Sequence, residues 1–344
     1  MVVSQISVCG LGAVSPAGWG VAALRTALES ASPLPLQSLA RPGTEPLPIR
    51  LVPAMPVRPS FLAHPRLRRA SPLTHYGAAA VLESLAWLPP EQRFRIRCGL
   101  VVCLQAGCAQ YPCRFFEETM RDPATASPLL FPETVFAALA SHLASLLENV
   151  PLACTLVGDP ATFLHGLALA ADWLNQGRVD TCIVLGAEEP HWISAEALRC
   201  FERSSILASG AGALCLSRNA GGSLGVDLDR ITDAHTYTAK KSRAQAAHDM
   251  RSQLPGSSAN DLLCDGITGE ARLDAAEAAA WRDWSTARIS PKRALGEGLM
   301  ASAAWQCVAA CAALASGRFA AANVSLVGSN QQAIGARFVR NHAT

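Results

Sequence analysis

The chain has 344 residues, of which 50% are hydrophobic and only 16% are charged, and its formal net charge is +2. Such a length can bury a large core in one or two domains. The small net charge, without any long basic block, argues against nucleic-acid binding. No apolar run reaches the roughly 18 residues that a membrane-spanning helix requires, so we expect no membrane span.

The twelve cysteines show no metal-binding pattern. No two of them have the C-x-x-C spacing, and Cys98 and Cys103 lie in the strand-like run CGLVVC, where cysteine behaves as a small hydrophobic residue. The N-terminal stretch MVVSQISVCGLGAV lacks the basic region of a secretory signal. We therefore expect reduced thiols, a cytoplasmic location, and no metal or cofactor.

The first 150 residues alternate between strand and helix patterns. We expect a strand from Gln5 that runs into a glycine-containing loop at 10–18, which lacks the third glycine of a dinucleotide-binding loop. Residues 31–60 are rich in proline and lack periodicity, which predicts an irregular surface excursion. The other predicted elements are helices at 21–30, 72–88 and 133–147 and a strand at 99–104. The nearly uncharged 133–147 helix indicates burial in a core or at a subunit interface.

The stretch from Leu152 to Glu189 organises the chain. Its pattern predicts a buried strand at 152–157, a turn at 158–160, a helix closed by Gly177 and a second buried strand at 181–185. A nucleophile would suit this turn, because the amides of a helix N-terminus stabilise negative charge. The residue there is Pro160, which fits the start of a helix and carries no nucleophilic atom.

The rest of the chain continues the alternation of strands and helices. The predicted strands are 210–217, 225–232, 261–264, 286–289, 323–327 and 337–339, and the predicted helices are 239–251, 274–284 and 299–316. We expect the first two of these strands to form an antiparallel pair. The alternation predicts a layered α/β fold whose sheets are covered by helices.

The order of these signals resembles the β-ketoacyl synthases of fatty-acid and polyketide assembly along nearly the whole chain. In the first half, ISVCGLGAVSPAG resembles the first strand and loop, SPLLFPETVFAALASHLA the interface helix, and TLVGDPATFLHGLALAADWLNQGRVDTCIVLGAEE the nucleophile turn with its helix and next strand. In the second half, ASGAGALCLSR is similar to the G-E-G-A-G segment, DGITGEARLDAAEAAAW to H-G-T-G-T…D-x-x-E, and SPKRALGEGLMASAAW to K-x-x-x-G-H…G-A-A-G.

This resemblance implies an α/β, thiolase-like fold. Two duplicated βαβαβαββ halves would form α/β/α/β/α layers. We expect the N-terminal half at 1–205, including the 31–60 excursion, and the C-terminal half at 206–344, with both packed as one globular unit.

The resemblance places residues without the family's chemistry at its catalytic positions. In that family a cysteine attacks the acyl thioester, and two histidines stabilise the enolate and the thioester oxyanion. Pro160 falls at the cysteine, Glu297 at the second histidine, and Gly266, or Asp265 after one insertion, at the first. A carboxylate at 297 would repel an oxyanion, and loss of one oxyanion donor typically costs about 10²–10³ in rate.

Several other positions bear on the same expectation. Lys292, Asp274 and Glu277 match residues of the family pattern, and Phe163 stands where the family often has glycine, so it would plug the acyl entrance. Cys154 in the preceding strand is the only substitute nucleophile we consider, and a core role fits it better. We therefore expect no competent ketosynthase from this chain alone.

Three functions stay open on these grounds. The first is a non-catalytic subunit, like a chain length factor, that pairs with an active ketosynthase in fatty-acid, polyketide or aryl-polyene biosynthesis. The 133–147 helix and 152–157 strand would form this interface, with a heterodimer favoured over a homodimer.

The second is an enzyme with altered chemistry, in which Asp159, Glu297 and Asp265 line one cavity as general acid and base or as ligands of a cation. We favour hydrogen-bonded polar side chains that fill a former active site. The third is a protein that binds acyl groups or acyl carrier protein, with an acidic partner on a basic patch. The patch would contain Arg66, Arg68, Arg69 and Arg203, although we favour a solvated turn as the explanation of the first three.

Overall fold

The computed structural model describes residues 2–30, 32–55, 57–93, 95–218, 224–238, 240–328 and 331–341. The elements up to residue 217 are β1 Val2–Ser15, β2 Gly18–Trp19, α1 Val21–Ser30, β3 Gln37–Arg41, β4 Thr44–Arg50, η1 Ser60–Ala63, η2 Pro65–Leu67, α2 Pro72–Ser84, α3 Pro90–Arg93, β5 Cys98–Leu104, α4 Gln110–Arg121, η3 Phe131–Thr134, α5 Ala138–Leu147, β6 Leu152–Val157, α6 Thr162–Asn175, β7 Thr181–Glu188, α7 Trp192–Phe201, β8 Leu207–Ala208 and β9 Gly210–Ser217. The remaining elements are β10 Val226–Ile231, β11 His235–Thr236, α8 Lys240–Ser252, β12 Asp261–Cys264, α9 Ala271–Ala280, β13 Ala287–Ile289, α10 Pro291–Leu295, α11 Met300–Ala315, β14 Ala321–Val327 and β15 Gln332–Arg340.

The main sheet is a duplicated structure. Within the described ranges its strand order is β13-β12-β14-β15-β10-β1-β9-β7-β5-β6, with β2 and β11 added beside β1 and β15. Numbered along the chain, the strands of each five-stranded half follow the same order, 3-2-4-5-1. In both halves strands 2, 3 and 4 pair in parallel, and strands 4, 5 and 1 pair antiparallel. The antiparallel β1–β10 pair joins the two halves.

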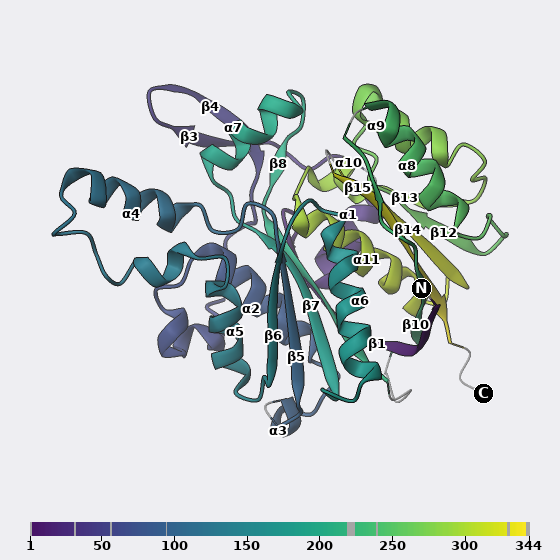
Figure 1. Cartoon of the computed structure of the whole chain (residues 1–344), viewed down its shortest axis with the longest axis horizontal. Helices are drawn as coiled ribbons and strands as arrows, with labels where there is room; N and C mark the ends of the chain where they lie inside the picture. The colour runs from purple at the N-terminus through teal and green to yellow at the C-terminus, as the bar shows by residue number, and fades with distance from the viewer. Residues whose placement is uncertain are drawn as a thin grey trace.

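The helices form three layers around these two half-sheets. α2 and α5 cover the outer face of the first half, and α8 and α9 lie on the far side of the second half, while α6 and α11 fill the space between (Figure 1). Nearly all of α11 is buried, because it contacts strands of both halves. This confirms the predicted α/β class and the α/β/α/β/α layering. No helix within the described ranges is long and apolar enough to cross a bilayer.

The first strand differs from the expectation of a glycine loop. Gly10 and Gly12 lie inside β1, which continues to Ser15. A Cβ atom at Gly10 would lie 1.9 Å from the carbonyl oxygen of Ser84, and one at Gly12 would lie 1.8 Å from that of Ala80. These glycines are needed because α2 packs directly on the strand, so their role is close packing.

Residues 31–60 are more ordered than predicted. β3 and β4 form a hairpin, and β4 also pairs in parallel with β8, giving a separate three-stranded sheet. Leu47 and Ile49 alternate inward and are buried with Leu198 of α7. The prolines of β4 obscured this alternation in the sequence.

One predicted strand pairing was wrong. The segments 210–217 and 225–232 do not pair with each other, because β1 lies between β9 and β10. β9 is the fifth strand of the first repeat, although we expected it to begin the second half. We propose that the two halves meet between Ser217 and Val226, downstream of residue 205.

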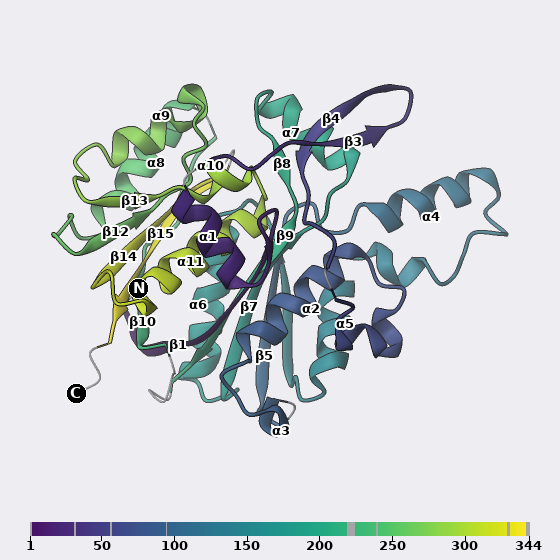
Figure 2. The same ribbon diagram turned by 180° about the vertical axis from the view of Figure 1, so that it is seen from behind.

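The structure also corrects several helix boundaries. The predicted 133–147 helix is the short η3 turn followed by α5, which begins at Ala138. α2 ends at Ser84, and α9 spans Ala271–Ala280. Four helices of the described residues, the short α3 and α10 and the longer α4 and α7, were not predicted. α4 has no buried residue and projects away from the body of the molecule in Figures 1 and 2.

Candidate functional site

The turn between β6 and α6 contains Pro160, the residue at the expected nucleophile position. Pro160 is buried in this turn and offers neither a nucleophilic atom nor a backbone N–H. The amides of Thr162 and Phe163 donate to the carbonyl oxygens of Asp159 and Pro160, at 2.9 and 3.2 Å. These donors therefore close the turn itself. This turn cannot supply covalent catalysis through residue 160.

Asp159 is fixed by the loop that precedes β15. The side-chain nitrogen of Gln332 donates to Oδ1 of Asp159 at 3.2 Å, and its backbone N–H donates to Oδ2 at 3.4 Å. A Cβ atom at Gly328 would lie 1.9 Å from Oδ2, so only glycine permits this approach. Burial raises the pKa of Asp159, although the hydrogen bonds from Gln332 oppose that shift. These contacts give Asp159 a structural role.

Phe163 points into the protein core. Its side chain is fully buried in the cluster between the two half-sheets, and a Cβ atom at Gly186 would lie 3.1 Å from its ring. Aromatic bulk fills the space beside β7 at this position. A plug at the acyl entrance stays a prediction for Phe163.

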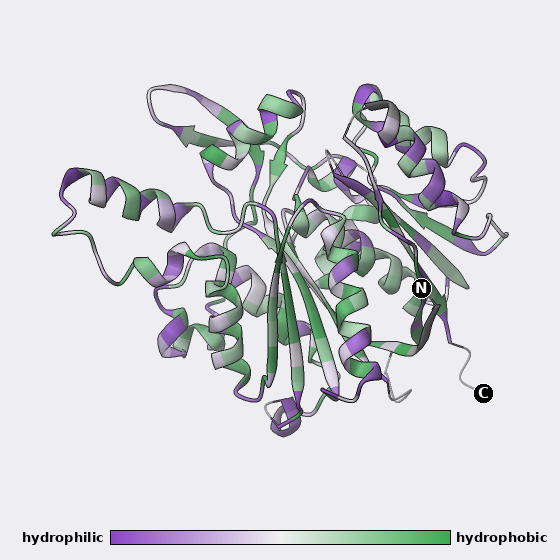
Figure 3. Cartoon of the chain, viewed as in Figure 1, coloured by the Kyte–Doolittle hydropathy of each residue, from purple (hydrophilic) through white to green (hydrophobic). Residues whose placement is uncertain are grey.

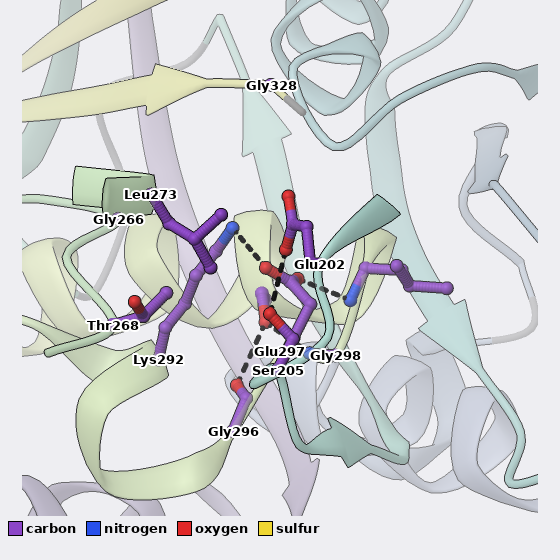
Figure 4. A network of polar contacts seen from close by, with 12 residues as sticks. Glu202, Ser205, Gly266, Thr268, Leu273, Lys292, Gly296, Glu297, Gly298 and Gly328 are labelled. Atoms are coloured by element: carbon purple, nitrogen blue, oxygen red, sulfur yellow. Dashed lines mark hydrogen bonds and ion pairs between the residues drawn. The ribbon is translucent and has the colours of Figure 1, made fainter. Parts of the chain in front are cut away.

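Lys292 and Glu297 form a buried ion pair (Figure 4). Nζ of Lys292 lies 2.6 Å from Oε2 of Glu297, and the N–H of Leu299 donates to Oε1 at 2.8 Å. Burial by itself would lower the pKa of Lys292, but Glu297 more than offsets this effect, so the pKa lies above its usual value. Leu299 has a φ of +50°, a conformation that the carboxylate at 297 helps to hold.

Asp265 and Gly266 lie where β12 ends and belong to a neighbouring network. Oδ1 of Asp265 accepts a hydrogen bond from the Ser290 hydroxyl at 2.5 Å, and the N–H of Gly266 donates to Glu277 at 3.0 Å. Glu277 also accepts from Ser325 at 2.5 Å. Burial and the charge of Asp265 raise the pKa of Glu277 to about 7. Asp274, the remaining family match, accepts from the backbone N–H groups of residues 268 and 269.

One lysine is the electrostatic centre of these carboxylates. Besides Glu297, the charges of Glu202 and Glu277 raise the pKa of Lys292, and Lys292 in turn lowers that of Asp159. Each of these carboxylates has hydrogen-bond partners of its own. In the part of the chain that the structure describes, no group of three or more His, Cys, Asp or Glu side chains could hold a metal ion. The arrangement resembles a filled polar site more than a poised acid–base pair.

A solvent-open cleft of about 1110 Å³ lies next to this network, between α7, α8 and α9. Its wall reaches Glu202, whose carboxylate accepts from Ser205 at 2.8 Å, and Leu299, which is bonded to Glu297. Arg203, Arg243 and Arg272 also line it. Apart from Arg203, none of these residues was predicted as a site residue, because they come from three separate helices or loops.

The four arginines proposed as a carrier patch lie on different elements. Arg66, Arg68 and Arg69 are in or just after η2, which contacts α5, and the hydroxyl of Tyr111 donates to the carbonyl of Arg69 at 2.6 Å. Arg203 instead lines the cleft beside α7. The expectation of one basic patch is therefore not supported by their placement.

An exposed apolar surface is a second candidate site. It lies on the projecting segment 110–136 and at the end of β6, where the exposed large hydrophobic side chains are Phe116, Met120, Leu129, Phe131, Val135, Phe136 and Val157. β6 was predicted to be buried, but it is the last strand of the sheet and Val157 is 51% exposed. Figure 3 shows that β6 is hydrophobic along most of its length. An apolar edge strand of this kind is a template for pairing with another chain.

Glu188 and Glu189 anchor the base of that projection. The carboxylate of Glu188 accepts from the N–H groups of residues 105 and 107 at 2.6 and 2.8 Å, and Glu189 accepts from residues 109 and 110, both at 2.8 Å. Burial and the charge of Glu189 raise the pKa of Glu188 to about 8, although these hydrogen bonds oppose the shift. Glu189 therefore supplies an acceptor for the N-terminal amides of α4, and Glu188 holds the loop that precedes the helix.

No protein-family model matches the sequence, and no curated protein matches it. Solved structures do match it. A chain from a type II PKS acyl-carrier protein in complex with its ketosynthase bound to the hexaketide is 16% identical with a TM-score of 0.81, covering 99% of this chain and 100% of that one. The ishigamide ketosynthase/chain length factor is 18% identical with a TM-score of 0.77, covering 98% and 100%. A β-ketoacyl synthase from Burkholderia phymatum STM815 is 13% identical with a TM-score of 0.80, covering 98% and 99%. The chain therefore has the thiolase-like fold of ketosynthases and chain length factors, as the sequence motifs predicted.

Proposed function

We propose that this chain is a non-catalytic ketosynthase-like subunit that pairs with an active β-ketoacyl synthase, as a chain length factor does. The observation that carries the proposal is Pro160, which occupies the nucleophile turn of the fold without a nucleophilic atom or an N–H group. Fatty-acid, polyketide and aryl-polyene biosynthesis are the pathways we propose for the pair.

The surroundings of Pro160 support the absence of condensation chemistry. Glu297, at the position of the second family histidine, is held in an ion pair with Lys292 at 2.6 Å. Gly266, at the first histidine, has no side chain to donate a hydrogen bond. Restoring the family's residue at one of these three positions would therefore leave the other two without their catalytic groups. The effects of catalytic groups that act together are strongly non-additive.

The exposed apolar surface supports a pairing role. The 110–136 projection and the end of β6 present large apolar side chains, with Phe116 65% exposed and Val157 51% exposed. An apolar patch of several large side chains marks an interaction site in most proteins. We propose that this surface contacts the partner synthase, with a homodimer as the second possibility.

Co-expression with β-ketoacyl synthases of the same organism tests the proposal. We expect a one-to-one complex that condenses acyl groups only when both chains are present. Val157→Arg should prevent co-purification, because a charge would be buried at the interface. Val57→Arg is the matched control, since Val57 is 76% exposed and lies outside the surface. A monomer indifferent to every synthase, or equal effects of the two variants, would contradict the pairing role.

Binding of an acyl carrier protein is the second candidate function. The cleft of about 1110 Å³ supports it, because Arg203, Arg243 and Arg272 line it and carrier proteins are acidic partners. We expect Arg203→Glu to weaken carrier binding, while Arg68→Glu, on the separate η2 cluster, should leave it unchanged. If Arg68→Glu weakens carrier binding and Arg203→Glu does not, the docking site is the η2 cluster.

An enzyme with altered chemistry receives less support. Asp159, Asp265 and Glu297 each hold separate hydrogen-bond partners, and no hydrogen bond joins any two of these described side chains. Titration with divalent cations tests the metal version, since a rise in melting temperature would revive it.

A further inference from the structure

A pocket on the opposite side of the second half-sheet lies apart from the polar network. It has a volume of about 330 Å³ and is bounded by α1, α11 and the strands β12 and β13. Figure 2 shows α1 beside α11 on this side of the molecule. β13 is the terminal strand of the second half, as β6 is of the first. The pocket is therefore remote from the surface that we propose for the partner.

The interior of this pocket is apolar. Leu24 and Leu28 of α1 form one wall, Ala312 of α11 forms another, and Leu262 of β12 and Ile289 of β13 lie between them. Leu28, Ala312 and Ile289 are only partly buried although they pack on the central core. These side chains would gain hydrophobic stabilisation if an apolar group covered them.

The rim of the pocket is positively charged. Arg25 and Arg318 line it together with a single carboxylate, Glu29, which leaves an excess of one positive charge, because the guanidinium of the third lining arginine, Arg288, pairs instead with Asp265 at 3.8 Å. Glu29 lies 4.0 Å from Nε of Arg25 and 3.6 Å from NH1 of Arg318, so it approaches both without forming a close hydrogen bond to either. Arg318 is 48% exposed at its side chain. A ligand with one anionic end can therefore use donors that Glu29 does not satisfy.

We propose that this pocket binds a medium-chain monocarboxylate, with the hydrocarbon chain between α1 and α11 and the carboxylate at Arg318. The volume lies at the small end of the range for ligand pockets, which suits a chain of about eight carbons. The charge excess selects an anion over a neutral or cationic amphiphile. The proposal is independent of the pairing role and stands if that role fails.

Calorimetric titration of the full chain, or of its complex, with sodium octanoate tests the proposal. We expect saturable binding, with hexanoate about tenfold weaker because two methylene groups are lost. Octylammonium chloride has the same chain with the opposite charge, and we expect no saturable binding of it. Absence of octanoate saturation, or equal binding of octylammonium, would overturn the proposal.

Three variants locate the site. Ala312→Trp should abolish octanoate binding by filling the pocket, and its fold is checked by thermal melting. Arg318→Gln should weaken binding about three- to fivefold, whereas Glu29→Gln should strengthen it by removing the competing carboxylate. Arg66→Gln, on the exposed η2 cluster, is the matched control and should have no effect. Unchanged affinity in Arg318→Gln and Glu29→Gln would place octanoate elsewhere and refute the site even if Ala312→Trp misfolds.

Discussion

The buried Lys292–Glu297 pair gives the sharpest prediction for stability. Glu297→Gln removes one charge but keeps an oxygen that can accept from the N–H of Leu299. The Lys292 ammonium, only 9% exposed at its side chain, then lacks its partner at 2.6 Å. Removing one member of a buried pair typically costs about 3–5 kcal/mol. Because Glu202 and Glu277 still face the lysine, we expect a loss near 3 kcal/mol, at the lower end of that range.

Urea unfolding followed by tryptophan fluorescence measures this loss. The midpoint should fall while the slope m stays constant, because the variant exposes the same surface on unfolding. Lys292→Met combined with Glu297→Gln should recover most of the stability, since neither charge is then buried alone. Glu29→Gln is the exposed control, because Glu29 is half exposed and 4.0 Å from Arg25, and it should change stability by less than about 1 kcal/mol.

The reasoning fails under either of two results. If the free energy of unfolding of Glu297→Gln lies within about 1 kcal/mol of that of the unmodified chain, the ion pair does not stabilise this part of the fold. If the double variant is no more stable than the single one, the loss comes from packing around residue 297. A double-mutant cycle on Lys292 and Glu297 measures the coupling energy between the two positions and so separates these explanations.

Three further predictions follow from the same geometry. Pro160→Cys should give no condensation by this chain alone, because Glu297 stays at the oxyanion position; acyl transfer by the variant would contradict this. Burial and Asp265 raise the pKa of Glu277 to about 7, so the folded chain holds a proton that the unfolded chain loses above its usual value of 4.5. Relative to Glu277→Gln, stability in urea should therefore fall between about pH 5 and 7 by up to about 1.4 kcal/mol per pH unit, and a flat difference would refute the shift. Glu188→Ala should leave the backbone amides of the loop before α4 without acceptors, so hydrogen exchange at 105–107 should accelerate and pairing with the synthase should weaken; unchanged exchange would show that Glu188 does not hold the projection.

Much of the layered core could be predicted because its signals are local. The strands Leu152–Val157 and Asp261–Cys264 have the bounds that their apolar runs indicate. α11 is apolar all round, and it is buried between the two half-sheets as such a helix should be. Strand pairing was harder, since the insertion of β1 between β9 and β10 joins residues about 200 positions apart and leaves no local pattern.

The parts that sequence reasoning missed depend on contacts between distant residues. α4 is amphipathic, a helical signal that sequence reasoning overlooked, but none of its residues is buried, and its N-terminus depends on Glu189, which follows β7. The Lys292–Glu297 contact depends on Gly296, whose φ of +95° turns the chain between them. Asp159 meets Gln332 across more than 170 residues. Each contact requires the tertiary fold before it can form.

The distribution of charge and apolar surface argues for a role in assembly. A site that binds a developing anion needs unpaired donors, whereas here Lys292 is paired with Glu297 and the turn amides bond to their own loop. Large apolar side chains are exposed elsewhere, at the end of the edge strand β6 and on the projection that Glu188 and Glu189 hold in place. Exposing that edge carries a risk of aggregation unless a partner covers it. We infer that a covered β6 edge is the state in which this chain works, and that its stability depends on the partner's concentration.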